Sequence, residues 1–187
     1  SFASPREAER AGVSLFYQEL SLVPQLSVES NIFLGHEPRR FGFVDRAALR
    51  READQLIGLF SGVVGASLTP SATVADLSPD ERQIVEILKA FATRPKLMIM
   101  DEATAALDGR QAARLFEILR AKRGDGVSTI MISHRLDEVF AVCDRITVMR
   151  NGESVAALDV ASTDRAAVVH HMLSLIHISE PTRQEAI

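Results

Sequence analysis

The sequence is poor in the residues that mark several classes of protein, and each shortage narrows what the chain can be. Its single cysteine, Cys143, excludes a disulfide within the chain and suits a reducing compartment. Tryptophan is absent and aromatic residues make up only 5% of the chain, so the sequence offers no platform for stacking nucleic-acid bases. No apolar run approaches the roughly 20 residues that cross a bilayer, and we expect any role at a membrane to be peripheral.

Positive charge is also in short supply. The chain has 21 lysine and arginine residues against 25 aspartate and glutamate residues, which gives a net charge of −4. Nucleic-acid-binding proteins usually carry a basic surplus, so no nucleic-acid partner is expected. The rest of the composition, with 47% hydrophobic and 25% charged residues over 187 positions, indicates a soluble globular domain or part of a larger one.

The most informative absence concerns lysine. The stretch KLMIMDEATAALD, residues 96–108, is a short apolar run that ends at Asp101 and Glu102. This pattern supplies carboxylates to Mg²⁺ and to a water beside a bound phosphate, and such a site also needs a loop of the form G-x-x-x-x-G-K-[ST]. The three lysines are followed by alanine, leucine and arginine, so none belongs to such a loop. The chain starts with serine, and we expect it to be a fragment whose phosphate loop lies upstream of Ser1.

The spacing of apolar residues predicts an α/β domain. Strands are expected over Val13–Tyr17, Leu97–Met100 and Ser128–Ile132, with a mostly helical region from about 21 to 92 after the first strand. Strands that alternate with helices imply a parallel sheet. Near the end of the chain, RITVM and ESVAAL flank an Asn-Gly pair, which predicts a β-hairpin.

Helix starts are marked by capping residues. Ser4 and Glu7 have the spacing of a capping box, and Asp45 is placed to begin a helix over Arg46–Phe60, with Leu56 on its buried face. Asp108 is placed to begin a helix that ends at Gly124. Cys143 falls on an apolar helical face and is expected in the core.

Four stretches carry a resemblance when they are taken together and in order: YQELSLVPQLSVESNIFLG (17–35), LSPDERQIVEILKA (77–90), LMIMDEATAALD (97–108) and MISHRLDEV (131–139). This combination resembles the nucleotide-binding subunits of ABC transporters. The sugar importers of the ribose, xylose and galactose type, which have two such domains in tandem, are the most similar branch, and the first domain is the best match. The resemblance covers about residues 1–172.

The resemblance implies a fold and a set of ligands. The fold is that of a P-loop NTPase (RecA-like), with a parallel sheet core, a helical subdomain inserted at about 21–92 and a C-terminal β-hairpin, here without the N-terminal part that holds the Walker A loop. The implied ligands are ATP and Mg²⁺. The implied partners are a second nucleotide-binding domain, a transmembrane permease and, indirectly, an extracytoplasmic sugar-binding protein. The implied location is the cytoplasmic face of the cell membrane.

The resemblance also implies roles for single residues. Gln18 matches the glutamine that contacts Mg²⁺ and the attacking water. Asp101 matches the aspartate that holds Mg²⁺ through water, and Glu102 matches the catalytic glutamate that orients and polarises the attacking water. His134 matches the histidine at the γ-phosphate, and Asp108 matches an aspartate at the interface with the second domain.

The family signature, L-S-G-G-Q, contacts the γ-phosphate bound to the partner domain, and here it departs from that pattern. The corresponding signature segment consists of Ser78, Pro79, Asp80, Glu81, Arg82 and Gln83. Pro79 removes a backbone donor, and Asp80 adds a carboxylate where a helix start would otherwise attract an anion. We expect Ser78 and Glu81 to form a capping box and Arg82 to offset part of the repulsion. The hypothesis is that this half supplies a weak signature.

Two alternative functions remain open at the level of sequence. The first is a regulatory half-domain that binds nucleotide and turns it over slowly. The second is a helicase-like motor, because Asp-Glu-Ala-Thr resembles the second motif of DEAD-box proteins. The motor would need Ser-Ala-Thr after the acids and a basic face, whereas the chain has ISHR and a negative net charge.

The end of the chain breaks the preceding pattern. LSLIHISEPTR, residues 173–183, back-translates cleanly into the transposon-end adapter used for short-read sequencing. We therefore expect residues 173–187 to be adapter and index read-through rather than native protein, so that the chain is cut at both ends. The alternative is a genuine amphipathic tail.

Overall fold

The computed structural model describes residues 2–16 and 21–173. The chain divides into two compact units, Ser1–His134 and Arg135–Ile187. Gln18 lies outside the described residues, as do residues 174–187 of the tail that is predicted to be non-native.

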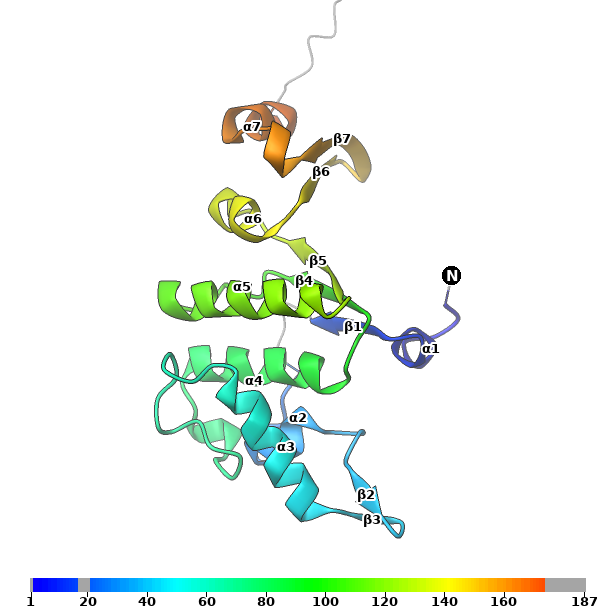
Figure 1. Ribbon diagram of the computed structural model, residues 1–187, viewed down its shortest axis with the longest axis vertical. Helices are drawn as coiled ribbons and strands as arrows, with labels where there is room; N and C mark the ends of the chain where they lie inside the picture. The colour runs from blue at the N-terminus through cyan, green and yellow to red at the C-terminus, as the bar shows by residue number, and fades with distance from the viewer. Residues whose placement is uncertain (1, 17–20, 174–187) are drawn as a thin grey trace, which may run out of the picture. The chain divides into compact units, whose positions relative to one another are not determined.

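The first unit is built on a three-stranded parallel sheet (Figure 1). In spatial order, the strands are β1 (Val13–Phe16), β4 (Leu97–Asp101) and β5 (Ser128–Ile132). Parallel neighbours need long crossover connections, and both connections here contain helices. The predicted parallel sheet is confirmed, with the first strand described as far as Phe16.

The two faces of this sheet differ in burial. Met98 and Met100 of β4 point to one face and are at most 1% exposed. Alternate residues of a strand point to opposite faces, and on the other face Leu15 is 41% and Ile130 is 50% exposed. These two side chains belong to one row across the sheet, because both residues pair with Ile99.

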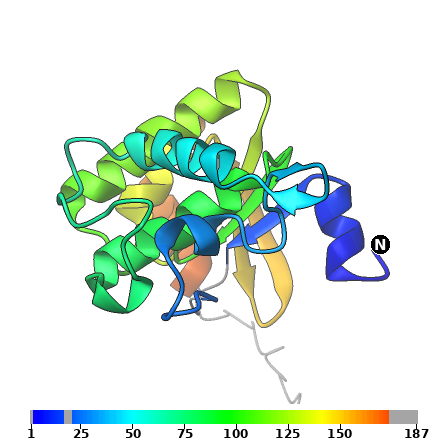
Figure 2. The same ribbon diagram turned by 90° about the horizontal axis from the view of Figure 1, so that it is seen from below.

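A helical region separates β1 from β4, as predicted for residues 21–92. Its elements are α2 (Val28–Ile32), α3 (Arg46–Gly58), a 3-10 turn η1 (Val74–Asp76) and α4 (Pro79–Ala92). The three α-helices pack against one another, and α4 also packs on β1 (Figure 1 and Figure 2). Ile84, Ile87 and Leu88 of α4 are completely buried, so this helix forms much of the core.

The start of α3 agrees with the prediction and its end does not. Asp45 accepts a hydrogen bond from the amide of Ala48 (3.0 Å), which caps the helix. The helix ends at Gly58, before the predicted end at Phe60. Ile57 is buried on its inner face, whereas Leu56, which was expected there, is half-buried.

A small hairpin inside this region is absent from the sequence-based prediction. It consists of β2 (Arg39–Arg40) and β3 (Phe43–Val44). Its turn residues, Phe41 and Gly42, have φ values of 53° and 85°. Two positive values are typical of tight hairpin turns, but phenylalanine rarely adopts the first of them. The usual Asn-Gly or Asp-Gly signal is therefore missing.

Helices flank the sheet strands with bounds close to those predicted. α5 (Gly109–Gly124) connects β4 to β5 and begins after Asp108 as predicted. α1 (Pro5–Arg10) precedes β1, and the Ser4 hydroxyl caps it by accepting from the amide of Glu7 (3.3 Å). The Glu7 carboxylate accepts instead from the amide of Ala3 (2.5 Å), so the predicted return bond to Ser4 is not formed.

The second unit holds the predicted hairpin. Its elements are α6 (Leu136–Val142), β6 (Arg145–Arg150), β7 (Glu153–Asp159), a 3-10 turn η2 (Val160–Ser162) and α7 (Arg165–Leu173). β6 and β7 pair antiparallel, and the turn residues Asn151 and Gly152 both have positive φ, as this turn requires. Cys143, expected in the core, is half-buried after α6, and burial raises the pKa of its thiol, with a smaller contribution from Asp144.

Candidate functional site

The adjacent carboxylates lie at the carboxyl end of β4. Asp101 is the last residue of the strand and pairs with Ile132 of β5. The amide of Glu102 donates to the carbonyl of Ile132 (3.0 Å), which ties the following turn to the neighbouring strand. Glu102 has φ 49°, which lies in the left-handed region. Residues other than glycine adopt this backbone conformation only at an energetic cost. Such strain persists where the surroundings fix it, and it clusters at functional sites.

His134 joins this site from the end of the next strand. Its Nδ1 lies 2.9 Å from Oε1 of Glu102, although the two residues are 32 positions apart. The His134 side chain is 73% exposed and that of Glu102 is 31% exposed, so the pair faces solvent at the sheet edge. Neighbouring parallel strands bring their carboxyl ends to one edge, which explains why residues predicted separately lie together.

Asp101 could supply one of the ligands of a metal ion. Its side chain is half-buried and makes no hydrogen bond within the described part of the protein. Mg²⁺ binds through one or two carboxylates together with water and phosphate oxygens. In residues 2–16 and 21–173, no group of three or more acidic, histidine or cysteine side chains has the arrangement of a metal site. The donors therefore fit a Mg²⁺ shared with a phosphate better than one held by protein alone.

The signature segment starts α4 with the predicted capping box. The amide of Ser78 donates to Oε2 of Glu81 (3.0 Å), and the amide of Glu81 approaches the Ser78 hydroxyl (3.5 Å). Glu81 is 6% exposed, and its carboxylate also accepts from the Ser67 hydroxyl. The predicted roles of Ser78 and Glu81 in capping are confirmed. Pro79 occupies the first turn, where its missing N–H is harmless to the helix.

Asp80 and Arg82 have different hydrogen-bond partners. The Arg82 guanidinium donates to the carbonyls of Val74 (3.1 Å) and Ala75 (2.7 Å), and its expected effect on the repulsion of a phosphate stays a prediction. The Asp80 carboxylate instead accepts from the side-chain amide of Gln111 (2.7 Å) and from the Ser78 hydroxyl (2.5 Å). These two bonds, with Gln111 the larger cause, lower the pKa of Asp80.

Two other predicted residues have structural partners. Gln83 is buried, and its side-chain amide donates to the carbonyl of Ala103 (3.0 Å), which connects α4 to the turn after Glu102. The Asp108 carboxylate caps α5 by accepting from the amides of Arg110 and Gln111, both at 2.8 Å. Each residue therefore fixes one of the segments around the carboxylate site.

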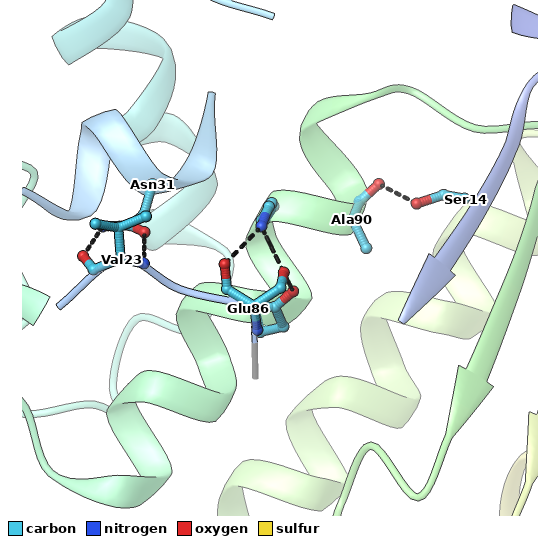
Figure 3. Close-up of polar contacts among 7 residues, drawn as sticks. Ser14, Val23, Asn31, Glu86 and Ala90 are labelled. Atoms are coloured by element: carbon cyan, nitrogen blue, oxygen red, sulfur yellow. Dashed lines mark hydrogen bonds and ion pairs between the residues drawn. The ribbon is translucent and has the colours of Figure 1, made fainter. Parts of the chain in front are cut away.

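A polar cluster that the sequence analysis missed surrounds Ser21, the first described residue after Gln18. The carboxylate of Glu86, which is 5% exposed, accepts from the Ser21 amide (3.1 Å) and hydroxyl (2.7 Å) (Figure 3). Lys89 donates to the Ser21 hydroxyl (2.6 Å). Before the undescribed residues, the Ser14 hydroxyl donates to the carbonyl of Ala90 on the same helix (3.3 Å). Glu86, an acidic residue on the apolar face of α4, was the feature of the sequence that could have indicated this cluster.

Asn31 forms a second part of this cluster. Its side chain accepts from the amide of Val23 (2.7 Å) and donates to the carbonyl of the same residue (3.0 Å) (Figure 3). Asn31 is completely buried on α2, so these bonds satisfy its amide. The segment from Ser21 to Val23 is thus hydrogen-bonded to both α2 and α4.

Comparison with known proteins agrees with this architecture. The family model described as ABC transporter matches residues 2–105, which is more than half of the chain. The chain therefore belongs to the ABC transporter family of ATP-binding domains. This assignment is inconsistent with the helicase-like alternative.

Among individual proteins, the chain is similar to ATP-binding proteins of ribose import. The chain is 47% identical over 171 residues to the ribose import ATP-binding protein RbsA of Chromobacterium violaceum. The aligned region covers 91% of this chain and 33% of that protein. It is 45% identical over 172 residues to RbsA 3 of Rubrobacter xylanophilus, covering 92% of this chain and 34% of the relative. The chain thus spans about a third of the length of these relatives.

Solved structures share the fold. An ATP-binding cassette solved as a dimer in a post-hydrolysis state with ADP and Pi superposes with a TM-score of 0.72 at 17% identity, over 86% of this chain and 68% of that one. The ADP form of another ABC transporter cassette gives 0.63 at 22% identity, over 95% of this chain and 68% of the other. The predicted P-loop NTPase fold is confirmed.

Proposed function

We propose that this chain is part of an ATP-binding subunit whose hydrolysis of ATP drives the import of a sugar. The observation that carries the proposal is the pair of Glu102 and His134, 2.9 Å apart, beside Asp101 at the carboxyl end of the parallel sheet. Ligands of open parallel sheets bind outside this end of the strands. The names of the relatives point to ribose or a similar sugar as the transported molecule.

Glu102 is assigned the role of general base. With Nδ1 protonated, His134 donates to Oε1, which leaves Oε2 to accept a proton from the attacking water. The water oxygen then bonds to the γ-phosphorus while the bond from phosphorus to the bridging oxygen breaks and ADP leaves. Such transfers depend mainly on positioning and on charge stabilisation, which a pair fixed on neighbouring strands supplies.

The remaining site residues are assigned around the phosphates. Asp101 would hold Mg²⁺ through a water, and Gln18 would contact both the ion and the attacking water. Bound Mg²⁺ supplies positive charge that neutralises the phosphate oxygens. The second ring nitrogen of His134 would donate to the γ-phosphate when the ring carries both protons. Asp108 and the signature segment are assigned to the interface with the second domain, where the signature would contact that domain's nucleotide.

The proposed partners follow from the sugar-import assignment. They are a second nucleotide-binding domain, a transmembrane permease and, through the permease, an extracytoplasmic sugar-binding protein. The proposed location is the cytoplasmic face of the membrane. Within residues 2–16 and 21–173, no helix combines the length and apolarity needed to cross a bilayer.

A second candidate function is a regulatory half-domain with slow turnover, and Asp80 favours it. A helix start attracts anions through its unpaired amides and its dipole. Here a carboxylate lies in the first turn of α4 and accepts the Ser78 hydroxyl bond that a phosphate would otherwise receive. The two candidates differ in rate rather than in chemistry.

The test uses the complete reading frame that encodes this chain. Glu102→Gln keeps the size of the side chain but removes the base, so steady-state ATP hydrolysis should fall by about 10²–10⁴-fold. Binding of ATP, measured by equilibrium dialysis, should persist because the phosphate contacts remain.

The matched control is Glu117→Gln on α5, an exposed glutamate that pairs with Arg114. It makes the same chemical change away from the sheet edge and should leave the rate unaltered. Unchanged hydrolysis in the Glu102→Gln protein would refute the assignment of the base, and a parent protein without ATPase activity would refute the proposed function itself.

A further inference from the structure

Gln111 lies between two segments that the proposed function places at the same interface. Its side chain is 4% exposed. The Nε2 amide donates to Oδ2 of Asp80 (2.7 Å) and to the carbonyl of Val63 (3.3 Å), and Oε1 accepts from the amide of Asp108 (3.0 Å). One buried side chain therefore connects the signature segment, the loop at Val63 and the turn that begins α5.

The residue type matters for this arrangement. A side-chain amide donates and accepts at once, whereas a carboxylate only accepts and an ammonium only donates. A glutamate at position 111 would retain the bond to the Asp108 amide but would face the Asp80 carboxylate with a second negative charge. Methionine has a similar length and would lose all three bonds. Gln111 is thus matched to a signature segment that has aspartate in place of glycine.

The charged groups around Asp80 leave Gln111 as its main partner on α5. The Arg110 guanidinium donates to the carbonyl of Gly62 (2.7 Å), and the Asp108 carboxylate caps α5. On α4, the Glu81 carboxylate bonds the Ser78 amide, and the Arg82 guanidinium bonds backbone carbonyls. The two side-chain bonds that hold Asp80 therefore come from Gln111 and Ser78.

We propose that Gln111 is a positioning residue of the ATPase: it fixes the signature segment against the Asp108 turn, so that both face the second nucleotide-binding domain as one rigid surface. This inference rests on the proposed function, because that function places both segments at the interface. Gln111 does not itself touch nucleotide in this assignment. It acts by holding Ser78 and Asp80 in register with Asp108.

The first test measures ATP hydrolysis by the complete reading frame that encodes this chain. Gln111→Glu should lower kcat about tenfold, which corresponds to the loss of one hydrogen bond to a charged group. KM for ATP should stay within about twofold, because Gln111 does not touch the nucleotide in this assignment. In an Asp80→Asn background the same substitution should have no effect, because the new amide at position 80 donates to the new carboxylate.

The second test does not require nucleotide. In Gln111→Glu two carboxylates share one site, so their folded-state pKa values rise above the unfolded values of about 3.9 and 4.3. The variant should therefore be less stable than the parent at neutral pH and should recover relative stability as the pH falls towards the unfolded values. Thermal unfolding followed from about pH 4 to about pH 8, a range that extends upward from these values, measures the effect.

The outcomes separate the two proposals. Equal loss of kcat with aspartate or asparagine at position 80 would overturn the positioning role, as would a stability change in Gln111→Glu that does not vary with pH. Gln111→Met, which adds no charge, should lower kcat without a new pH dependence, and it replaces Gln111→Glu if that variant does not fold. A parent without ATPase activity would refute the proposed function, and the unfolding experiment would still decide whether Gln111 holds Asp80.

Discussion

Asp80 is a carboxylate at a position where the resemblance predicts a signature glycine, and its neighbours explain how the fold accommodates it. Gln111 and Ser78 both donate to it, which keeps it ionised and lowers its pKa. The same bonds use a serine hydroxyl that the resemblance assigns to a phosphate. The local structure is therefore satisfied without a ligand.

The signature departure leads to a prediction about turnover. Pro79→Gly combined with Asp80→Gly should raise kcat of the complete protein by about tenfold in net. The change restores one backbone donor and removes one of the two carboxylates that accept from the Ser78 hydroxyl, and these two gains at the phosphate should exceed the cost of losing the bond from Gln111 to Asp80. The measurement is steady-state phosphate release. Asp125→Gly, an exposed residue at the end of α5, is the matched control and should change nothing. An unaltered rate in the double variant would exclude a weak signature as the limiting feature.

Single residues were predictable from sequence when a regular element placed them. Glu102 and His134 follow two strands of a parallel sheet, so their common edge follows from the topology. The contact between Asp80 and Gln111 spans 31 positions and depends on how two helix starts pack, for which no periodic pattern exists. The partners of Arg82 were not predictable for the same reason, because its length lets it reach the carbonyls of Val74 and Ala75.

Among the elements of the first unit, α4 contacts several of the segments described above. Its start carries the signature segment, its middle holds Ser21 through Glu86, and its end accepts from Ser14. Its apolar face lies in the core at Ile84 and Leu88. A change in the stability of α4 should therefore affect the signature segment and the segments at Ser14 and Ser21 that it holds.

Core packing of α4 can be tested with one substitution. Leu88 is completely buried, and Leu88→Ala should lower the free energy of unfolding by about 2–5 kcal/mol, since it removes apolar contacts and leaves a cavity. Chemical denaturation followed by circular dichroism measures the change. Leu34, which is 40% exposed, is the control, and Leu34→Ala should shift stability by no more than about 0.5 kcal/mol. Equal effects at the two positions would contradict the described core.

Element bounds were predictable where capping residues mark them. Ser78 and Asp108 begin α4 and α5 with capping boxes, and Asn151-Gly152 marks the hairpin turn. The hairpin of β2 and β3 was missed because Phe41 adopts a backbone conformation that its side chain disfavours. Its turn is set by the surrounding chain rather than by local preference.

At the scale of the molecule, apolar side chains lie open on one face of the sheet. Ile130 and Ile132 of β5 are each 50% exposed, and Leu15 of β1 is 41% exposed. Among the described residues, β5 is also an edge strand. Exposed apolar edge strands pair with other chains.

The chain of 187 residues should therefore self-associate in solution. Ile130→Lys should reduce association, because a charge on an edge strand opposes pairing with another copy. Sedimentation velocity over a range of concentrations measures the effect. Leu34→Lys changes an exposed leucine outside the sheet and should leave association unchanged. Monomeric behaviour of the parent would show that this face does not promote contacts.

The left-handed backbone at Glu102 carries one more consequence. Glycine adopts this conformation freely, so a glycine there would relieve roughly 1–2 kcal/mol of local strain. Selection for thermal stability alone in the laboratory should therefore favour Glu102→Gly, which removes the carboxylate. A thermostable descendant of this protein should therefore be sequenced first at position 102, where stability favours glycine and the proposed catalysis requires glutamate.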